Sequence, residues 1–162
     1  MAVTINGLIA KKDDSTPFVS PVESKSYCEM VKKTGAMIIG RRTYEILSKQ
    51  PEFQEFEQVK IVVVSRTKFQ TLRPSDLVAE TPEKALSLVR DFKQVVVAGG
   101  GILNAAFMDQ DLIDEIYLDV EPAVVGSGIP LFAGGDFDRK LKLLEVNKLS
   151  DDEVQLHYKV IK

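Results

Sequence analysis

The sequence is poor in the residues that most often serve as nucleophiles or metal ligands. It contains one cysteine, Cys28, one histidine, His157, and no tryptophan. A single cysteine excludes an intrachain disulfide and is typical of proteins from a reducing compartment. With one cysteine and one histidine, we expect neither a conventional zinc site nor any other metal site. Mechanisms that need a nucleophile paired with a histidine are also disfavoured.

The chain also lacks long hydrophobic runs and a basic excess. No apolar stretch approaches the roughly 20 residues that span a bilayer, and the first residues lack the basic region and apolar core typical of a secretion signal. We therefore expect a cytoplasmic protein without a membrane partner. The formal net charge of −3 disfavours a nucleic-acid partner, because such domains are usually basic. The length suffices for one core, so we predict a single domain over residues 1–162.

Short apolar runs alternate with helical segments along the whole chain. Strands are predicted at residues 2–5, 7–10, 36–39, 59–65, 95–98, 113–121, 141–149 and 154–161. Helices are predicted to begin near residues 20, 40 and 81 and to cover 102–108. The first is expected to be capped by Ser20, with Pro21 at its first position, and to end at Gly35. This alternation is typical of an α/β fold with a mostly parallel sheet covered on both faces. The last two strands, joined by a short turn, are expected to form an antiparallel edge.

Three loops that follow predicted parallel strands carry residues suited to phosphate binding. They are Gly40-Arg41-Arg42-Thr43, Ser65-Arg66-Thr67 and Gly99-Gly100-Gly101. Glycines allow a ligand close to the backbone, while helix N–H groups and guanidinium groups attract anions. Each loop also has a purely structural interpretation, as a helix cap, a polar turn or a tight turn. Because ligands bind beyond the carboxyl ends of such strands, we expect the loops to converge on one dinucleotide.

Two of these segments resemble a known family. Residues 37–45, Met-Ile-Ile-Gly-Arg-Arg-Thr-Tyr-Glu, resemble the start of the third helix of dihydrofolate reductases, and residues 96–101 resemble their glycine motif. The stretch from Asp114 through Val125-Gly126-Ser127-Gly128-Ile129-Pro130-Leu131-Phe132 is most similar to the reductase domain of the riboflavin-biosynthesis deaminase–reductase. The resemblance runs in order over nearly the whole chain. It implies the dihydrofolate-reductase-like three-layer α/β fold and NADPH as cofactor.

The resemblance also implies which residues contact the cofactor. The residues that it places beside the nicotinamide are Ile9, Ala10 and Ala98. Those that it places at the phosphates are Gly40, Arg41, Arg42 and Thr43, with Gly99, Gly100 and Gly101 against the pyrophosphate. Ser65 and Arg66 match the site for the adenosine 2′-phosphate.

Two carboxylates are candidate catalytic residues, because they could favour protonation of a substrate nitrogen. Dihydrofolate reductases hold the pterin with a carboxylate on the first helix, and that position falls near Glu23 and Ser24. Tyr27, one helical turn further, could stack on a flat substrate. Asp119 points to the same side of its strand as Tyr117 and Glu121 and could reach the substrate from the opposite wall. The residues expected to bind the substrate are Ser24, Tyr27 and Tyr117. The alternatives are a capping box for Glu23 and a solvated edge position for Asp119.

We consider three functions. The first is reduction of 7,8-dihydrofolate by NADPH, with hydride transfer to a C=N bond of the pterin. The second is a riboflavin-pathway reductase that acts on a ribosylamino-pyrimidine. The third is a non-catalytic nucleotide-binding module. Riboflavin-type relatives are usually dimers and many dihydrofolate reductases are monomers, so a homodimer is one expected state.

Overall fold

The structure is a computed structural model that describes all residues from Met1 to Lys162. The elements are β1 (Ala2–Thr4), β2 (Leu8–Lys11), α1 (Pro21–Thr34), β3 (Ala36–Gly40), α2 (Arg41–Leu47), the 3₁₀ helix η1 (Pro51–Phe56), β4 (Lys60–Val64), β5 (Leu77–Ala79), α3 (Pro82–Ser87), β6 (Val96–Val97), α4 (Gly101–Asp109), β7 (Glu115–Glu121), β8 (Gly128–Pro130), β9 (Lys140–Lys148) and β10 (Val154–Ile161).

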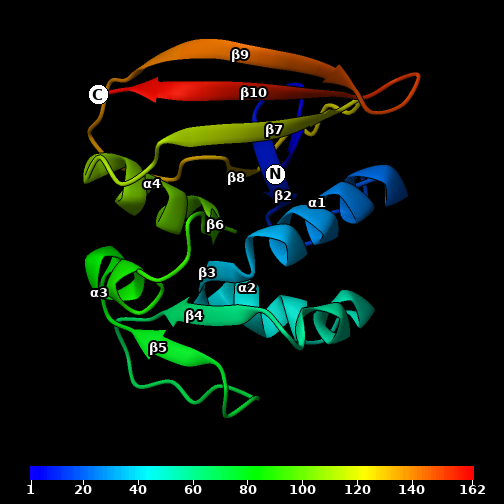
Figure 1. The fold of residues 1–162 in the computed structure, drawn as a ribbon. Coiled ribbons are helices and arrows are strands. Elements are labelled where there is room, and N and C mark those ends of the chain that lie inside the picture. Colours follow the sequence, from blue (N-terminus) through cyan, green and yellow to red (C-terminus); the bar gives the residue numbers. More distant parts are fainter.

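The strands form two larger sheets and one small one. The first sheet is parallel and has the order β5-β4-β3-β6. In the second, of order β1-β7-β10-β9, β1 runs parallel to β7 while β10 is antiparallel to both of its neighbours. Strands β2 and β8 form a separate antiparallel pair. Figure 1 shows β9 and β10 at one end of the molecule and β5 at the other.

Strand β3 separates two hydrophobic clusters because its side chains alternate between the faces of the sheet. Met37 and Ile39 pack with α1, α2 and η1, whereas Ala36 and Ile38 pack with residues of α3 and α4. Helices therefore cover both faces of the parallel sheet. The predicted α/β fold with a mostly parallel sheet and an antiparallel C-terminal edge is confirmed.

Helix α1 begins and ends where the sequence predicts. Ser20 caps it by accepting a hydrogen bond from Glu23 N–H at 3.0 Å, and Pro21 occupies the first helical position. Gly35 ends the helix in the left-handed conformation, at φ 72°, with its N–H bonded to Val31 O. No helix of the structure is long and apolar enough to cross a membrane.

The structure differs from the sequence-based expectation at several short elements. Strands β5 and β8 and the helix η1 were not predicted, because segments of three to six residues carry too little periodicity to be distinguished from loops. The buried strand expected at 95–98 is only two residues long, and Val96 and Val97 are half-buried. The reason is that β6 pairs with β3 on one side only.

Candidate active site

The three glycine and arginine loops meet at one rim of the parallel sheet. Strands β4, β3 and β6 are parallel neighbours, so their carboxyl ends lie side by side. Gly40 N–H donates a 2.8 Å hydrogen bond to Gly99 O, which joins the loops after β3 and β6. Arg41 Nη1 donates to Thr67 Oγ1 at 3.2 Å, which joins the loops after β3 and β4. The predicted convergence of the loops is therefore present in the structure.

The Gly99-Gly100-Gly101 turn has little room for side chains. Gly99 has φ 85°, a left-handed conformation that suits glycine. A Cβ on Gly100 would lie 3.4 Å from Thr43 Oγ1, and a Cβ on Gly101 would lie 2.3 Å from Pro130 O. Gly100 is the N-cap of α4, and no side chain caps this helix. Its first N–H groups are therefore free to bind an anion.

The two arginines after Gly40 have different partners. Arg42 forms an ion pair with Asp14, with a 2.8 Å bond from Nε, and so ties the loop after β2 to the start of α2. Arg41 reaches Thr67 and lies 4.0 Å from Glu45. Both guanidinium groups are substantially exposed. A ligand can therefore reach both, but at Arg42 it would compete with Asp14.

Ser65 contributes mainly to the shape of its own loop. It is buried, and its hydroxyl donates a 2.8 Å hydrogen bond to Thr67 O. This bond holds a tight turn in which Arg66 is exposed. Arg66, rather than Ser65, is thus the group that can meet an anion at the end of β4.

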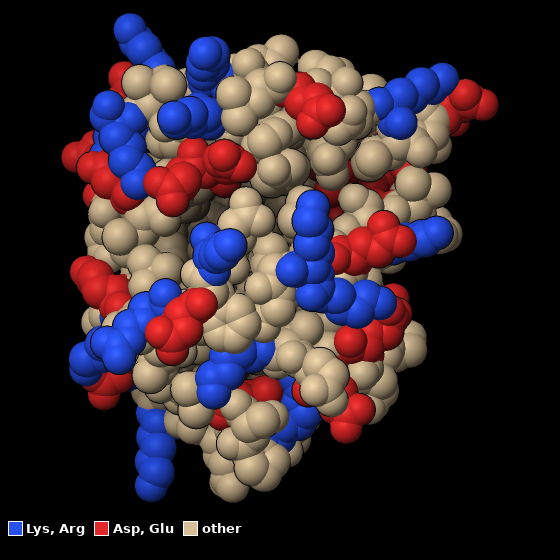
Figure 2. Space-filling model, viewed as in Figure 1, with Lys and Arg blue, Asp and Glu red and all other residues tan.

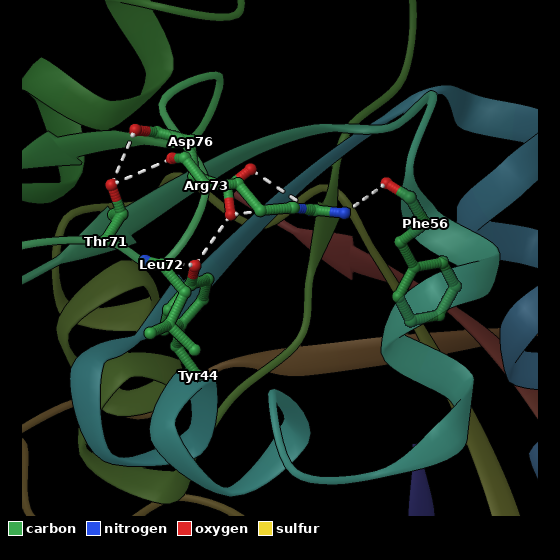
Figure 3. A network of polar contacts seen from close by, with 6 residues as sticks. All are labelled: Tyr44, Phe56, Thr71, Leu72, Arg73 and Asp76. Atoms are coloured by element: carbon green, nitrogen blue, oxygen red, sulfur yellow. Dashed lines mark hydrogen bonds and ion pairs between the residues drawn. The ribbon is translucent and has the colours of Figure 1, made fainter.

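A buried network that the sequence analysis missed holds the rest of this loop (Figure 3). Asp76 accepts a 2.7 Å bond from Tyr44 Oη and two 3.0 Å bonds from Arg73. Arg73 also donates to Phe56 O at 3.1 Å, while Tyr44 Oη accepts from Leu72 N–H. The network fixes the β4–β5 connection against α2 and η1. In the sequence, the one sign of this network is the i, i+3 spacing of Arg73 and Asp76.

The two predicted catalytic carboxylates, Glu23 on α1 and Asp119 on β7, are both buried. Burial, together with the charges of Asp119 and Glu121, raises the pKa of Glu23 to about 7, although the nearby Met1 amino group acts in the opposite direction. Asp119 accepts a 2.7 Å bond from Gln155 Nε2 and a 3.1 Å contact from Met1 N. The alternative of a solvated edge position for Asp119 is therefore wrong.

The capping-box alternative for Glu23 is only half right. Ser20 caps the helix as expected, but its own N–H donates to Glu121 Oε1 at 3.1 Å and not to Glu23. Glu121 and Glu153 face each other, and each has a buried Oε2 without a hydrogen-bond partner. Burial is the main cause that raises the pKa of Glu121. Glu121 of β7 thus accepts the hydrogen bond from Ser20 N–H that Glu23 would accept in a capping box.

Two of the predicted substrate residues, Tyr27 and Tyr117, line one cavity together with Asp119, whereas Ser24 does not. Tyr27 Oη donates to Met37 Sδ at 3.2 Å, its ring packs edge-on to Phe56, and burial raises its pKa. Tyr117 stacks on His157 with ring centroids 3.9 Å apart. Ser24 lies on another face of α1, in a shallow pocket shared with residues of η1. Tyr27 is half-buried and lines the same cavity as Tyr117, so its stacking on a flat ligand stays a prediction.

The remaining predicted cofactor residues border the rim. Ile9 and Ala10 lie on β2, where Ala10 pairs with Ile129 of β8. Ala98 directly precedes the glycine turn and is buried.

No group of three or more His, Cys, Asp or Glu side chains could hold a metal ion. Figure 2 shows basic and acidic side chains interspersed over the face in view, without a large patch of one sign.

Comparison with known proteins identifies the family. The model of the RibD C-terminal domain family matches residues 1–155. The chain belongs to this family. The uncharacterized protein YwjB of Bacillus subtilis is 32% identical over 169 residues, which cover 98% of this chain and 94% of YwjB.

Two solved structures share the fold of this RibD C-terminal domain. A putative riboflavin biosynthesis protein from Shewanella sp. PV-4 superposes with a TM-score of 0.82 at 18% identity, covering 100% of this chain and 97% of that one. Dihydrofolate reductase from Enterococcus faecalis, complexed with NADP(H), gives 0.75 at 18% identity, with coverage of 99% and 94%. Together with the family match over residues 1–155, they confirm the predicted resemblance to the dihydrofolate-reductase-like superfamily and its riboflavin-pathway reductase domain.

Proposed function

We propose that this RibD C-terminal domain is an NADPH-dependent reductase. The observation that carries the proposal is the hydrogen bond from Gly40 N–H to Gly99 O, because it joins two glycine turns where the parallel strands end. Phosphate binding needs close backbone approach and free N–H donors, and these turns offer both. The E. faecalis structure of the same fold contains NADP(H), which supports this class of cofactor.

The residues at the rim fit a phosphorylated dinucleotide. The glycine turn and the uncapped start of α4 would hold the pyrophosphate, with Thr43 beside Gly100. Arg66 would bind the 2′-phosphate at the turn that Ser65 orders. The groups that would border the nicotinamide are Ile9, Ala10 and Ala98. When bound, NADPH supplies a hydride, and the protein's task is to position the two reactants and exclude water.

Glu23 and Asp119 would manage the proton that accompanies hydride transfer. When hydride adds to the carbon of a C=N bond, the nitrogen takes up one proton. Glu23 has a pKa of about 7 because of burial, so a large fraction of its carboxyl groups carries a proton near neutral pH. Asp119, held by Gln155 at 2.7 Å, would position the neighbouring groups. In this division of roles, Glu23 delivers the proton to the substrate nitrogen.

The substrate would be a nitrogen heterocycle. The family match and the Shewanella relative favour the ribosylamino-pyrimidine of riboflavin synthesis. The presence of two buried carboxylates, Glu23 and Asp119, favours dihydrofolate instead, because a carboxylate can accept two N–H donors from a pterin edge. We place the pyrimidine first, since the family match covers almost the whole chain.

A binding and turnover experiment tests the proposal. NADPH and NADH are titrated against the protein, and loss of reduced-nicotinamide absorbance is then followed with the pyrimidine and with dihydrofolate. Binding of NADPH with oxidation in the presence of either substrate supports a reductase and selects the substrate. Absence of NADPH binding refutes the function, and binding without turnover of either substrate favours the nucleotide-binding module.

The variant Arg66→Ala tests the 2′-phosphate assignment. A charge-assisted hydrogen bond contributes about 1.5–3 kcal/mol, so the Kd for NADPH should rise by roughly 10- to 100-fold. The Kd for NADH, which lacks the phosphate, should stay the same. Lys68→Ala removes an exposed cation two residues further along and serves as the control. Equal weakening of both nucleotides by Arg66→Ala would contradict the assignment.

A further inference from the structure

Strands β9, β10 and β7 form a surface with one polar and one apolar face. Residues directly opposite each other in an antiparallel pair project from the same face, so the strand registers assign each side chain to a face. One face carries Asp119 and Gln155, and Gln155 Nε2 lies 3.5 Å from Ser26 Oγ, so this face is turned towards α1. We call the opposite side the β9–β10 face. On these two strands it carries Leu141, Leu143, Val146, Val154, Leu156 and Tyr158.

The β9–β10 face is exposed although it is apolar. Leu143 is 49% exposed and Val146 is 54% exposed. Neither hydrophobic cluster includes a residue of this face, and in Figure 1 no helix passes in front of β9 or β10 or behind them. An antiparallel sheet usually turns its apolar face to the core and its polar face to water. Here the apolar face has no cover within the chain.

Charge is confined to the end of the β9–β10 face. Lys148 shares this face, because it lies opposite Val154. It is the last residue of β9, and its Nζ forms an ion pair with Asp151 at 2.8 Å. The centre of the face therefore offers no charged group that would select a charged partner.

The free edge of β9 is protected against pairing with another strand. Lys140 and Lys142 lie along this edge, and both are exposed. The register between β9 and β10 shifts beside Tyr158, where Leu144 is the extra residue. Edge lysines and bulges both disfavour the addition of a further strand. A partner would therefore meet the face of the sheet and not its edge.

The size of the β9–β10 face limits the kind of complex that it can form. At about 3.3 Å per residue and about 4.8 Å between strands, the face and the adjoining part of β7 cover roughly 400 Å² of flat area. Apolar patches of this size on single chains often mark interaction sites. Two such faces would bury roughly 800 Å² or more in total, which is typical of weak, reversible complexes.

We propose that the β9–β10 face packs against the same face of a second copy of this chain, around a two-fold axis. The partner of this face must be flat, apolar and uncharged at its centre, and the second copy presents a surface with these properties. Two sheets with the same twist pack face to face with their strands about 30° apart. A patch that contacts itself across a two-fold axis is the commonest arrangement in soluble oligomers.

This arrangement gives the expected homodimer a specific interface. It does not depend on the proposed reductase activity, because the β9–β10 face is the side of the sheet opposite Asp119 and Gln155. The partner copy would cover the backs of the strands that hold these two side chains. No residue of either copy would enter the other copy's glycine turns.

Sedimentation equilibrium of the whole chain tests the proposal, over protein concentrations from about 1 μM to about 1 mM. The parent is compared with Leu143→Glu, which places a charge at the centre of the β9–β10 face. Lys142→Glu places the same side chain on the opposite face of β9 and is the matched control. Thermal unfolding at the lowest concentration verifies that each variant is folded. Neither measurement involves NADPH, so its outcome is separate from that of the reductase assay.

The average mass of the parent should rise from one copy to two copies with increasing concentration. Leu143→Glu should raise the Kd of the dimer at least about tenfold, because the interface would bury an unpaired charge. Lys142→Glu should leave the Kd nearly unchanged. A single copy at every concentration overturns the proposal. So does a dimer that Leu143→Glu leaves intact, or one that both variants weaken equally.

A second measurement does not require Leu143→Glu to fold. Parent chains with ¹³C-labelled methyl groups are mixed with unlabelled chains, and NMR contacts between unlike copies are recorded at high concentration. Contacts that join the methyl groups of Leu141, Val146 or Val154 to the second copy support the proposal. A dimer whose contacts between copies involve none of these methyl groups overturns it.

Discussion

Glu23 makes the stability of the folded chain depend on pH in a calculable way. Its pKa is raised from 4.5 to about 7, chiefly by burial, so the folded state binds its proton more tightly than the unfolded state does. Each tenfold difference in proton affinity corresponds to about 1.4 kcal/mol. Ionising Glu23 in the folded protein therefore costs about 3 kcal/mol more than ionising it in the unfolded chain.

The sign of the effect follows from which state holds the proton. Below pH 4.5 the carboxyl is protonated in both states and contributes no pH dependence. Between this value and about 7 the folded state keeps the proton that the unfolded state loses, so the free energy of unfolding falls as pH rises. Above about pH 7, the full cost of ionising Glu23 lowers the free energy of unfolding. Glu23→Gln removes the titrating group, so the free energy of unfolding should no longer show this decrease with rising pH.

Urea unfolding of both proteins from pH 5 to pH 8 measures the effect. The difference in free energy of unfolding, variant minus parent, should increase by about 2–3 kcal/mol across this range. Glu29→Gln changes an exposed carboxylate of the same helix and is the matched control. If the curves of the parent and of Glu23→Gln run parallel, the reasoning about the buried carboxyl is wrong.

Three further substitutions test the packing that surrounds the site. Gly101→Ala would push a Cβ against a backbone carbonyl at 2.3 Å, so we expect a loss of about 1–3 kcal/mol by urea unfolding, whereas Gly126→Ala, with nothing within 4 Å, should change little. Tyr44→Phe leaves Asp76 without its 2.7 Å donor and should cost about 1–3 kcal/mol, seen as a lower urea midpoint at an unchanged slope. Phe107→Ala opens a cavity at a fully buried position and should cost about 3–5 kcal/mol; a loss below 1 kcal/mol would show that the surrounding cluster collapses to fill it.

Features specified by residues near one another in the sequence were predicted correctly. The caps of α1 depend on Ser20, Pro21 and Gly35, all within or beside the helix. The convergence of the three loops follows from their position after parallel strands, which the alternating pattern already implied. Local chemistry and topology were sufficient for these features.

Features that depend on distant partners were not predictable in the same way. Glu121 accepts a hydrogen bond from Ser20 N–H at the start of α1, although the two residues are 101 positions apart. The sequence pattern suggested a capping box with the nearby Glu23 instead. The Tyr44–Asp76 contact joins α2 to a loop that shows no regular pattern. The half-buried state of Val97 also follows from which strand lies beside β6 and not from its own hydrophobicity.

Strand β3 belongs to both hydrophobic clusters and ends at Gly40. Its alternate side chains anchor in the packing on both sides, so a disturbance in either cluster moves the same piece of backbone. The last N–H of that backbone holds the Gly99 carbonyl. Substitutions deep in the interior, far from any ligand, would therefore alter the spacing between the two glycine turns, and screens for altered nucleotide affinity should recover core variants as well as rim variants.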